Sequence, residues 1–187
     1  VNTFRGFLVD CYVRIDAMLN GKPFRLQPME GSSVFINQPD LFEILEDVIV
    51  VGMENAENFM QIRSQRWLFD VLFPGKQLLF VCRYPQENLE NLRSWLLRIP
   101  NRYVHFGDFD LAGVHIYLSE IYAHLGNRSS FLVPSDIEER LAEGNAALYN
   151  QQYAKFKNMA VTDVRLQPLV NMIHHYRRGY EQEGYIR

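Results

Sequence analysis

Three acidic residues directly follow apolar stretches of the sequence, at Glu54, Asp108 and Asp110. The two aspartates come after YVHFG, residues 103–107, and a single residue separates them. Because side chains alternate along an extended chain, positions two apart lie on the same side, and both carboxylates can face one point. Carboxylates held together must take up a proton, pair with a cation or share a metal ion. Such oxygen ligands favour magnesium, manganese or calcium.

Each of these acids also has a simpler structural interpretation. Asp110 can cap the helix that follows it, while Asp108 lies solvated in a loop. Glu54 can be a helix-start acid that the helix dipole favours, and the same holds for Glu57. The strands and helices around these acids therefore determine whether metal binding or helix capping is the better interpretation.

Four apolar runs of buried-strand type alternate with helical patterns. The expected strands cover residues 47–53, 77–82, 103–107 and 130–133, and the expected helices cover 57–69, 87–98 and the residues after 110. This alternation predicts an α/β fold with a parallel four-stranded, Rossmann-like sheet and helices on both faces. In the commonest doubly wound order the first and third strands are neighbours, so Glu54 and the two aspartates would converge on one crevice.

The segments GMENAENF and HFGDFDLAG, residues 52–59 and 105–113, resemble the Toprim domain of topoisomerases, primases and related nucleases. They are most similar to the branch formed by the topoisomerase VI A subunit and the nuclease subunit of Wadjet-type plasmid-defence systems. The resemblance covers residues 47–133 and, more weakly, the ending RRGYEQEGYIR. It implies a Toprim-like fold in which Glu54, Asp108 and Asp110 bind Mg²⁺ or Mn²⁺ and are catalytic, Glu54 also as a proton-transfer group.

The activity that this resemblance implies is metal-assisted cleavage of nucleic-acid phosphodiester bonds. In the topoisomerase branch a tyrosine of a separate winged-helix domain attacks the phosphate, whereas in the Wadjet branch the reaction is hydrolytic. No winged-helix pattern is visible here, so hydrolysis is the expectation and none of the ten tyrosines is nominated. The implied partners are DNA and either further subunits or an upstream winged-helix domain. A homodimer and a role in plasmid or phage defence are also compatible with it.

Three alternatives come from other classes of protein. A Toprim fold can be retained as a catalytically inactive structural or DNA-binding module. A phosphoacceptor receiver domain shares the doubly wound sheet, but its paired acids belong to the first strand. A phosphatase with an Asp nucleophile also carries its acidic motif on the first strand, followed by Thr or Val at the position that Ala112 occupies here.

Residues 1–46 are expected to form an N-terminal extension packed on a main domain of residues 47–187. Period-two segments predict short extended strands there, at 6–15, 22–28 and 32–37, with Asn20-Gly21 as a turn. Two patterns resemble capping boxes, each an N-cap residue followed three positions later by Glu: Asp40 with Glu43 and Ser135 with Glu138. Each predicts a following helix, and the last sixty residues are predicted to be helical.

Several further polar residues are candidates for binding. Arg63 and Arg66 are expected to face phosphate, and the C-terminal helices offer cations for a DNA backbone, namely Lys155, Lys157, Arg165, Arg177 and Arg178. An ordinary solvated helix face is the alternative for each of them. Glu181 and Glu183 are considered for the metal site, whereas surface or packing roles are expected of the histidines His105, His115, His174 and His175.

Composition restricts the class of protein. The 187 residues are 48% hydrophobic, enough for one soluble domain with its own core, and the net charge of −3 gives no global basic field. Neither a membrane-length apolar run nor a signal peptide is present, so no membrane partner is expected and a cytoplasmic protein is predicted. Cys11 and Cys82 are expected to be buried, reduced thiols. The start at Val1 suggests a fragment or processed chain.

Overall fold

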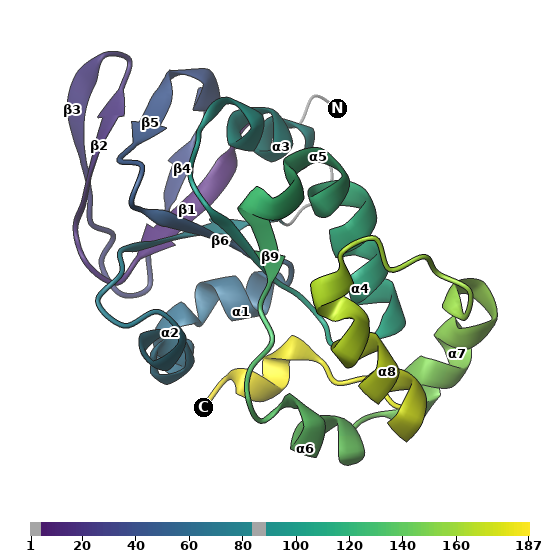
Figure 1. Ribbon diagram of the computed structural model, residues 1–187. Coiled ribbons are helices and arrows are strands. Elements are labelled where there is room, and N and C mark those ends of the chain that lie inside the picture. The colour runs from purple at the N-terminus through teal and green to yellow at the C-terminus, as the bar shows by residue number, and fades with distance from the viewer. Residues whose placement is uncertain (1–4, 84–88) are drawn as a thin grey trace.

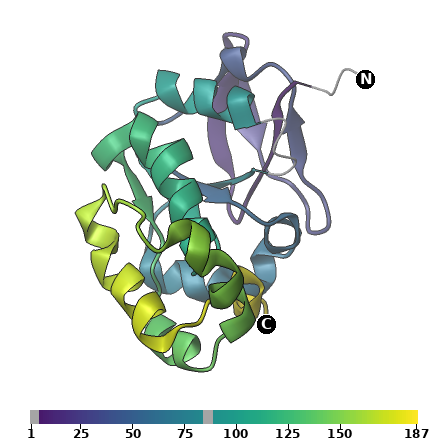
Figure 2. The same ribbon diagram turned by 90° about the vertical axis from the view of Figure 1, so that its right-hand side faces the viewer.

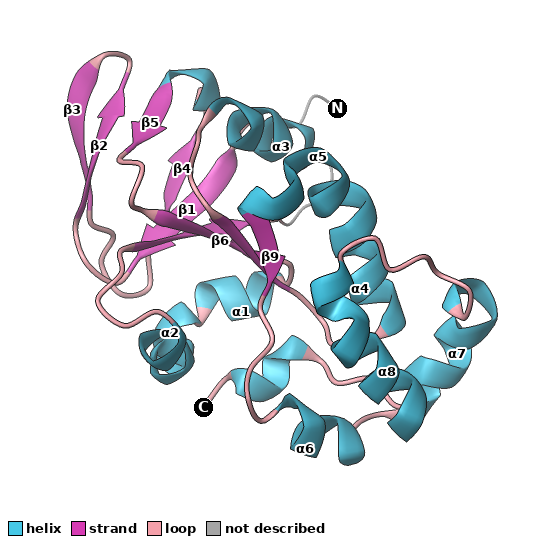
Figure 3. Ribbon diagram, in the orientation of Figure 1, coloured by secondary structure: helices cyan, strands magenta, loops and turns pink. Residues whose placement is uncertain are grey.

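A computed structural model describes residues 5–83 and 89–187 and has an α/β fold (Figures 1 and 3). Four of its strands form a parallel array in the order β7-β6-β8-β9. Their bounds are Ile49–Met53 for β6, Leu78–Cys82 for β7, Tyr103–Phe106 for β8 and Ser129–Phe131 for β9. The predicted parallel strands are therefore confirmed, and so is the adjacency of the first and third, β6 and β8.

The sheet is nevertheless larger than predicted. Strand β1, Phe7–Cys11, pairs antiparallel with β7, and β4, Val34–Ile36, pairs antiparallel with β1. The sheet is thus six-stranded and mixed, instead of four-stranded and parallel. The reason is that β7 would otherwise leave a row of unpaired backbone groups at its edge, and the N-terminal strands cover it.

A second sheet of three antiparallel strands has the order β3-β2-β5. It consists of β2, Ile15–Leu19; β3, Lys22–Leu26; and β5, Phe42–Ile44. The predicted turn at Asn20-Gly21 joins β2 to β3, with both residues in the left-handed region at φ of 52° and 67°. This is the backbone conformation that two-residue hairpin turns require.

The helix predicted after Asp40 is wrong. One 3-10 turn, Pro39–Leu41, ends where β5 begins at Phe42. The Phe42 ring stacks on Trp95 at 5.5 Å between centroids, and the Phe42 carbonyl accepts a hydrogen bond from the Trp95 indole at 2.9 Å. Pairing with β2 and this aromatic contact outweigh a local capping pattern.

Helices cover both faces of the large sheet, as predicted (Figures 1 and 2). On one face Phe69 of α2, Arg66–Leu72, packs against Phe80 and Phe106. On the other face Tyr117, just after α4, packs against His105. The α4 helix, Leu111–Ile116, continues as a π-helical segment over Tyr117–Tyr122 and as α5, Ala123–Leu125.

The predicted helix at 57–69 is broken into three pieces. They are α1, Ala56–Met60; a 3-10 turn, Ile62–Gln65; and α2. Helix α3, Leu89–Arg98, ends where the sequence predicts, while its predicted start at residue 87 lies outside the described residues.

The C-terminal part is helical, as expected. It contains α6, Ile137–Ala142; α7, Ala146–Phe156; and α8, Gln167–Tyr176. The capping box at Ser135 is wrong, because Asp136 is the N-cap residue and its carboxylate accepts a hydrogen bond from Arg140 at 2.7 Å instead. A final 3-10 turn, Gln182–Tyr185, returns to the main sheet and lies beside α1 (Figure 1).

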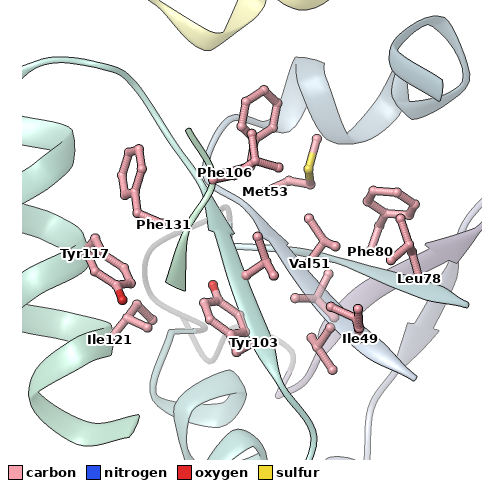
Figure 4. Close-up of a cluster of buried hydrophobic side chains, with 14 of the residues drawn as sticks. Ile49, Val51, Met53, Leu78, Phe80, Tyr103, Phe106, Tyr117, Ile121 and Phe131 are labelled. Atoms are coloured by element: carbon pink, nitrogen blue, oxygen red, sulfur yellow. The ribbon is translucent and has the colours of Figure 1, made fainter. Parts of the chain in front are cut away.

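The core lies between the sheet and its helices. Figure 4 shows buried side chains of β6, β7 and β8 together with Tyr117 and Ile121 of the adjoining helical segment. Both cysteines are buried thiols, as predicted, and burial raises the pKa of Cys11 to about 11. Among the described residues, no helix combines the length and the apolar character needed to cross a membrane.

Candidate functional site

A cavity of about 300 Å³ opens at the carboxyl ends of β6 and β8. Glu54 directly follows β6, and its backbone N–H donates to the carbonyl of Phe106, the last residue of β8, at 3.0 Å. Asp108 lies two residues beyond β8. The lining residues are Glu54, Asn55, Ala56, Arg83, Leu89, Asp108, Ile116, Glu120 and Gln182. Two of the three predicted acids therefore line one cavity, and the cation Arg83 lines it with them.

A continuous chain of polar side chains connects Glu54 through His105 to Arg83 and Glu120, which line the same cavity. The Glu54 carboxylate lies 3.0 Å from His105 Nε2, and Arg83 Nη1 lies 3.4 Å from His105 Nδ1. Arg83 also forms an ion pair with Glu120, with 2.6 Å between Nη2 and the carboxylate. Arg83 and His105 are buried, so this chain is fixed in place by the fold.

Gly107 makes the contact between Glu54 and His105 possible. A Cβ atom at this position would lie 2.3 Å from the Glu54 carboxylate and 2.6 Å from His105 Nε2. Both distances are far below van der Waals contact, so any other residue would push the two side chains apart. The glycine before the first aspartate of the motif is therefore explained by the site itself.

Protonation states follow from this chain. Burial lowers the pKa of His105, and the nearby Arg83 charge lowers it further, against the raising effect of Glu54. We therefore assign a neutral His105 whose Nε2–H donates to Glu54 and whose Nδ1 accepts from Arg83. Burial by itself would raise the pKa of Glu54, but the hydrogen bond from His105 and the Arg83 charge outweigh it and lower that pKa. Glu54 is thus ionised at neutral pH.

Asp108 is a carboxylate in an unfavourable place. Burial raises its pKa to about 7, and the negative charges of Asp110, Glu54 and Glu183 raise it in the same direction. The one opposing contact is a hydrogen bond from the Gln182 backbone N–H at 2.9 Å. Asp108 is therefore not the solvated loop aspartate of the alternative interpretation.

Asp110 has the capping role that was its alternative interpretation. One carboxylate oxygen accepts from the Gly113 N–H at 2.7 Å at the start of α4, and the other accepts from the Gln152 amide at 2.7 Å. Asp110 is 4% exposed and does not line the cavity. Its negative charge raises the pKa of Asp108, although Asp110 itself does not line the cavity.

The C-terminal 3-10 turn closes one side of the site. The backbone carbonyl of Gln182 accepts from the amide of Asn58 at 3.0 Å, and Asn55 donates to the carboxylate of Glu183. The backbone of Tyr180 pairs with Phe109, between the two aspartates, in an isolated bridge. The weak sequence resemblance in this ending thus falls on residues that pack against the acidic motif.

The other candidates of the sequence lie elsewhere. Arg63 pairs with the buried Asp10 at 3.0 Å, and Arg66 pairs with Asp70 at 3.2 Å, so neither lines the cavity. The structure thus does not bring either arginine to the cavity with Glu54 and Asp108, and a contact of Arg63 or Arg66 with phosphate stays a prediction. Glu57, by contrast, lies exposed on the first turn of α1.

The C-terminal cations also do not line this cavity. Arg165 is tied to Asp163 at 2.6 Å, and Arg178 donates to a backbone carbonyl at 2.6 Å. Lys155, Lys157 and Arg177 lie on the surface. Packing roles hold for two histidines, because His174 bonds the Tyr149 hydroxyl at 2.9 Å and His115 packs on Phe156.

The donor set suits a hard divalent cation. Glu54 and Asp108 offer carboxylate oxygens to one cavity, and Mg²⁺ needs only one or two carboxylates together with water and substrate phosphate. Within residues 5–83 and 89–187, no three His, Cys, Asp or Glu side chains are already gathered as ligands around one point. The carboxylate-rich environment that raises the pKa of Asp108 is nevertheless one that a cation would relieve.

Comparison with known proteins places the chain in a family. The sequence model of the family described as "Domain of unknown function (DUF7281)" matches residues 12–187. The chain belongs to this family. The match includes the three-stranded sheet as well as the parallel strands, so the DUF7281 domain contains every residue that lines the cavity. No curated protein matches the chain.

The raised pKa of Asp108 gives a testable dependence of stability on pH. The ordinary value is 3.8 and the folded value is about 7, so the folded state holds the proton more tightly, and stability falls as pH rises between these values. In EDTA, Asp108→Asn should therefore raise the free energy of unfolding above pH 7 by roughly 1–3 kcal/mol, and the gain should vanish near pH 4.

Urea unfolding of both proteins across this range measures the effect. An asparagine still accepts the hydrogen bond from the Gln182 N–H, so the loop geometry is kept. A variant that is less stable than wild type at pH 8 would show that Asp108 is not a strained carboxylate.

Proposed function

We propose that this domain cleaves phosphodiester bonds of nucleic acid with the help of Mg²⁺ or Mn²⁺. The observation that carries the proposal is the composition of one cavity wall, in which Glu54 and Asp108 stand beside Arg83 at the ends of adjacent parallel strands. Such a site combines oxygen ligands for a cation with a guanidinium for a phosphate oxygen. An uncharged or purely acidic pocket would not have this complementarity.

A bound divalent ion would orient the phosphate, activate water and stabilise charge on the leaving oxygen. The residues of the chain have separate tasks around it. Glu54 and Asp108 would hold the ion, and ionised Glu54 is also the group that can accept a proton from the attacking water. His105 donates to Glu54 and fixes its orientation, and Arg83 faces the same cavity with a positive charge.

The cavity also has one cation whose partner can be exchanged. The Arg83 guanidinium is bound to the half-exposed Glu120 carboxylate at 2.6 Å, while its Nε atom is buried and has no hydrogen-bond acceptor among the described residues. A phosphate that enters the cavity can supply acceptors to this guanidinium. Arg83 is therefore assigned as the residue that stabilises the negative charge of the scissile phosphate.

The wider proposal follows the resemblance of the sequence to Toprim domains. The adjacency of β6 and β8, with an acid at the end of each, supports a Toprim-like arrangement of the topoisomerase VI A and Wadjet type. The expected substrate is DNA, with further subunits or a winged-helix domain supplying most of the contacts to the backbone. Among the described residues that line the cavity, Arg83 is the single cation, and the net charge of the chain is −3. A cytoplasmic role in defence against plasmids or phages belongs to the same proposal.

Cleavage of a supercoiled plasmid tests the function. The full-length protein with its partner subunits should convert the plasmid to nicked or linear forms in Mg²⁺ or Mn²⁺, and EDTA should stop the reaction. Free 5′ or 3′ ends would indicate hydrolysis, whereas protein covalently attached to the DNA would indicate attack by a tyrosine. No cleavage with either metal, combined with retained DNA binding, would favour the catalytically inactive structural module.

A further inference from the structure

Gln182 lines the cavity, and its side-chain amide is buried without a hydrogen-bond partner among the described residues. Gln182 is 0% exposed, yet within residues 5–83 and 89–187 neither its amide nitrogen nor its amide oxygen has a hydrogen-bond partner. Burying an amide in this state costs free energy, because it has given up water without gaining a partner. Its backbone, by contrast, is fully used by Asp108 and Asn58. The side chain is therefore placed to meet something that enters the cavity.

Glu183, the next residue, also has a buried polar atom without a hydrogen-bond partner among the described residues, and its carboxylate is an acidic group. The Glu183 carboxylate accepts a hydrogen bond from Asn55 with one oxygen, and its second oxygen is buried with no partner in the part of the chain that the structure describes. Asn55 lines the cavity, and the negative charge of Glu183 is felt at Asp108. A buried carboxylate oxygen beside other carboxylates is unfavourable unless a proton or a cation compensates it.

We propose that Glu183, brought in by the C-terminal turn, is the third carboxylate of the metal site, with Glu54 and Asp108. This inference rests on the proposed metal-dependent function. Gln182 then supplies an amide to the water or phosphate oxygen bound at the ion. The three carboxylates are not gathered around one point in the present side-chain conformations, so Glu183 has to turn its unpartnered oxygen toward Asp108 when the ion binds.

Glu183 is better suited to this position than its acidic neighbours. Both oxygens of Asp110 are already committed, to the start of α4 and to Gln152. Glu181 precedes the turn and is exposed, and neither it nor Glu183 is among the residues that line the cavity in the present side-chain conformations. What distinguishes Glu183 is a buried carboxylate oxygen that has no hydrogen-bond partner among the described residues. The chain thus closes the site with its own C-terminal segment, which connects metal binding to the docking of that segment.

Titration of the full chain with Mn²⁺, followed by electron paramagnetic resonance of the free ion, tests this assignment. Glu183→Gln keeps the acceptor for Asn55 and removes the charge, and it should weaken Mn²⁺ binding about 10- to 100-fold. Glu181→Gln is the matched control, with the same change at an exposed position, and should bind as wild type does. Glu183→Asp keeps the charge with a shorter reach and should bind with an intermediate affinity.

Thermal unfolding with and without Mn²⁺ separates this role from a structural one. Glu183→Gln should melt no lower than wild type in EDTA and should lose most of the Mn²⁺-induced rise in melting temperature. A variant that melts lower in EDTA but binds Mn²⁺ as tightly as wild type would overturn the inference and leave the proposed function standing. A wild-type chain with no affinity for Mn²⁺ would overturn both.

Discussion

Glu54→Gln is expected to abolish nucleic-acid cleavage while the fold and most of the nucleic-acid binding remain. The amide has the same shape and still accepts the hydrogen bond that His105 donates at 3.0 Å. It loses the negative charge and the ability to take up a proton. Removing a positioned acid–base group costs about 10²- to 10⁴-fold in rate, before any loss of metal is counted. Plasmid cleavage by the wild-type and variant complexes in Mg²⁺ measures this effect.

Binding should survive because affinity for nucleic acid comes mainly from cationic contacts to many phosphates. An electrophoretic mobility assay is therefore the companion measurement. Glu57→Gln is the matched control, since Glu57 lies three residues after Glu54 on the first turn of α1 and is exposed, and it should cleave as wild type does. Cleavage by Glu54→Gln at the wild-type rate would show that the catalytic centre lies elsewhere.

The parallel strands were predictable because their signal is local. Each is a short apolar run that ends at a polar residue, and the intervening helical patterns fix parallel pairing. The placement of Glu54 and Asp108 at one cavity follows from that topology. The six-stranded extent of the sheet was not predictable, because the pairing of β1 with β7 joins segments about seventy residues apart through backbone groups that have no sequence signature.

Capping patterns were the least reliable signals. Asp40 and Ser135 both match the expected box, yet one precedes a strand and the other lies outside its helix. The sequence left Asp110 open between metal binding and capping. Its carboxylate oxygens accept hydrogen bonds at the start of α4 and from Gln152, and metal binding by Asp110 stays a prediction. The N-cap residue is the one next to the unpaired backbone N–H groups of the first turn. Its position therefore depends on where tertiary packing makes the helix begin.

His105 and Arg83 were missed as site residues for a different reason. His105 stands opposite Gly52 in the sheet, so its side chain shares a face with Glu54, which comes two residues after Gly52 and just past the end of β6. Alternation would have given this placement if the register had been known. Arg83 directly follows β7, at the same sheet edge as Glu54, and that position was the available signal. Gln182 and Glu183 had no local signal beyond the weak resemblance of the C-terminal ending.

The two aspartates of the motif are expected to differ sharply in their effect on metal binding. Asp108→Asn removes a carboxylate from the cavity wall and should lower Mn²⁺ affinity at least about tenfold. Asp110→Asn changes a residue that does not line the cavity, and asparagine is itself a good N-cap. Its Mn²⁺ affinity should stay within roughly threefold of wild type, because the change affects the site only by removing one negative charge near Asp108.

The free energy of unfolding should be lowered by Asp110→Asn, the variant that keeps the metal, and not by Asp108→Asn. Asp110→Asn turns the acceptor for the Gln152 amide into a group that can be a donor, and it should lower the free energy of unfolding by about 0.5–2 kcal/mol. Asp108→Asn should not lower it at neutral pH, because a strained carboxylate is removed. Mn²⁺ titration and urea unfolding of the same two proteins give both quantities. If Asp110→Asn loses the metal as completely as Asp108→Asn, both aspartates are ligands, and the hydrogen bonds of Asp110 must rearrange when the ion binds.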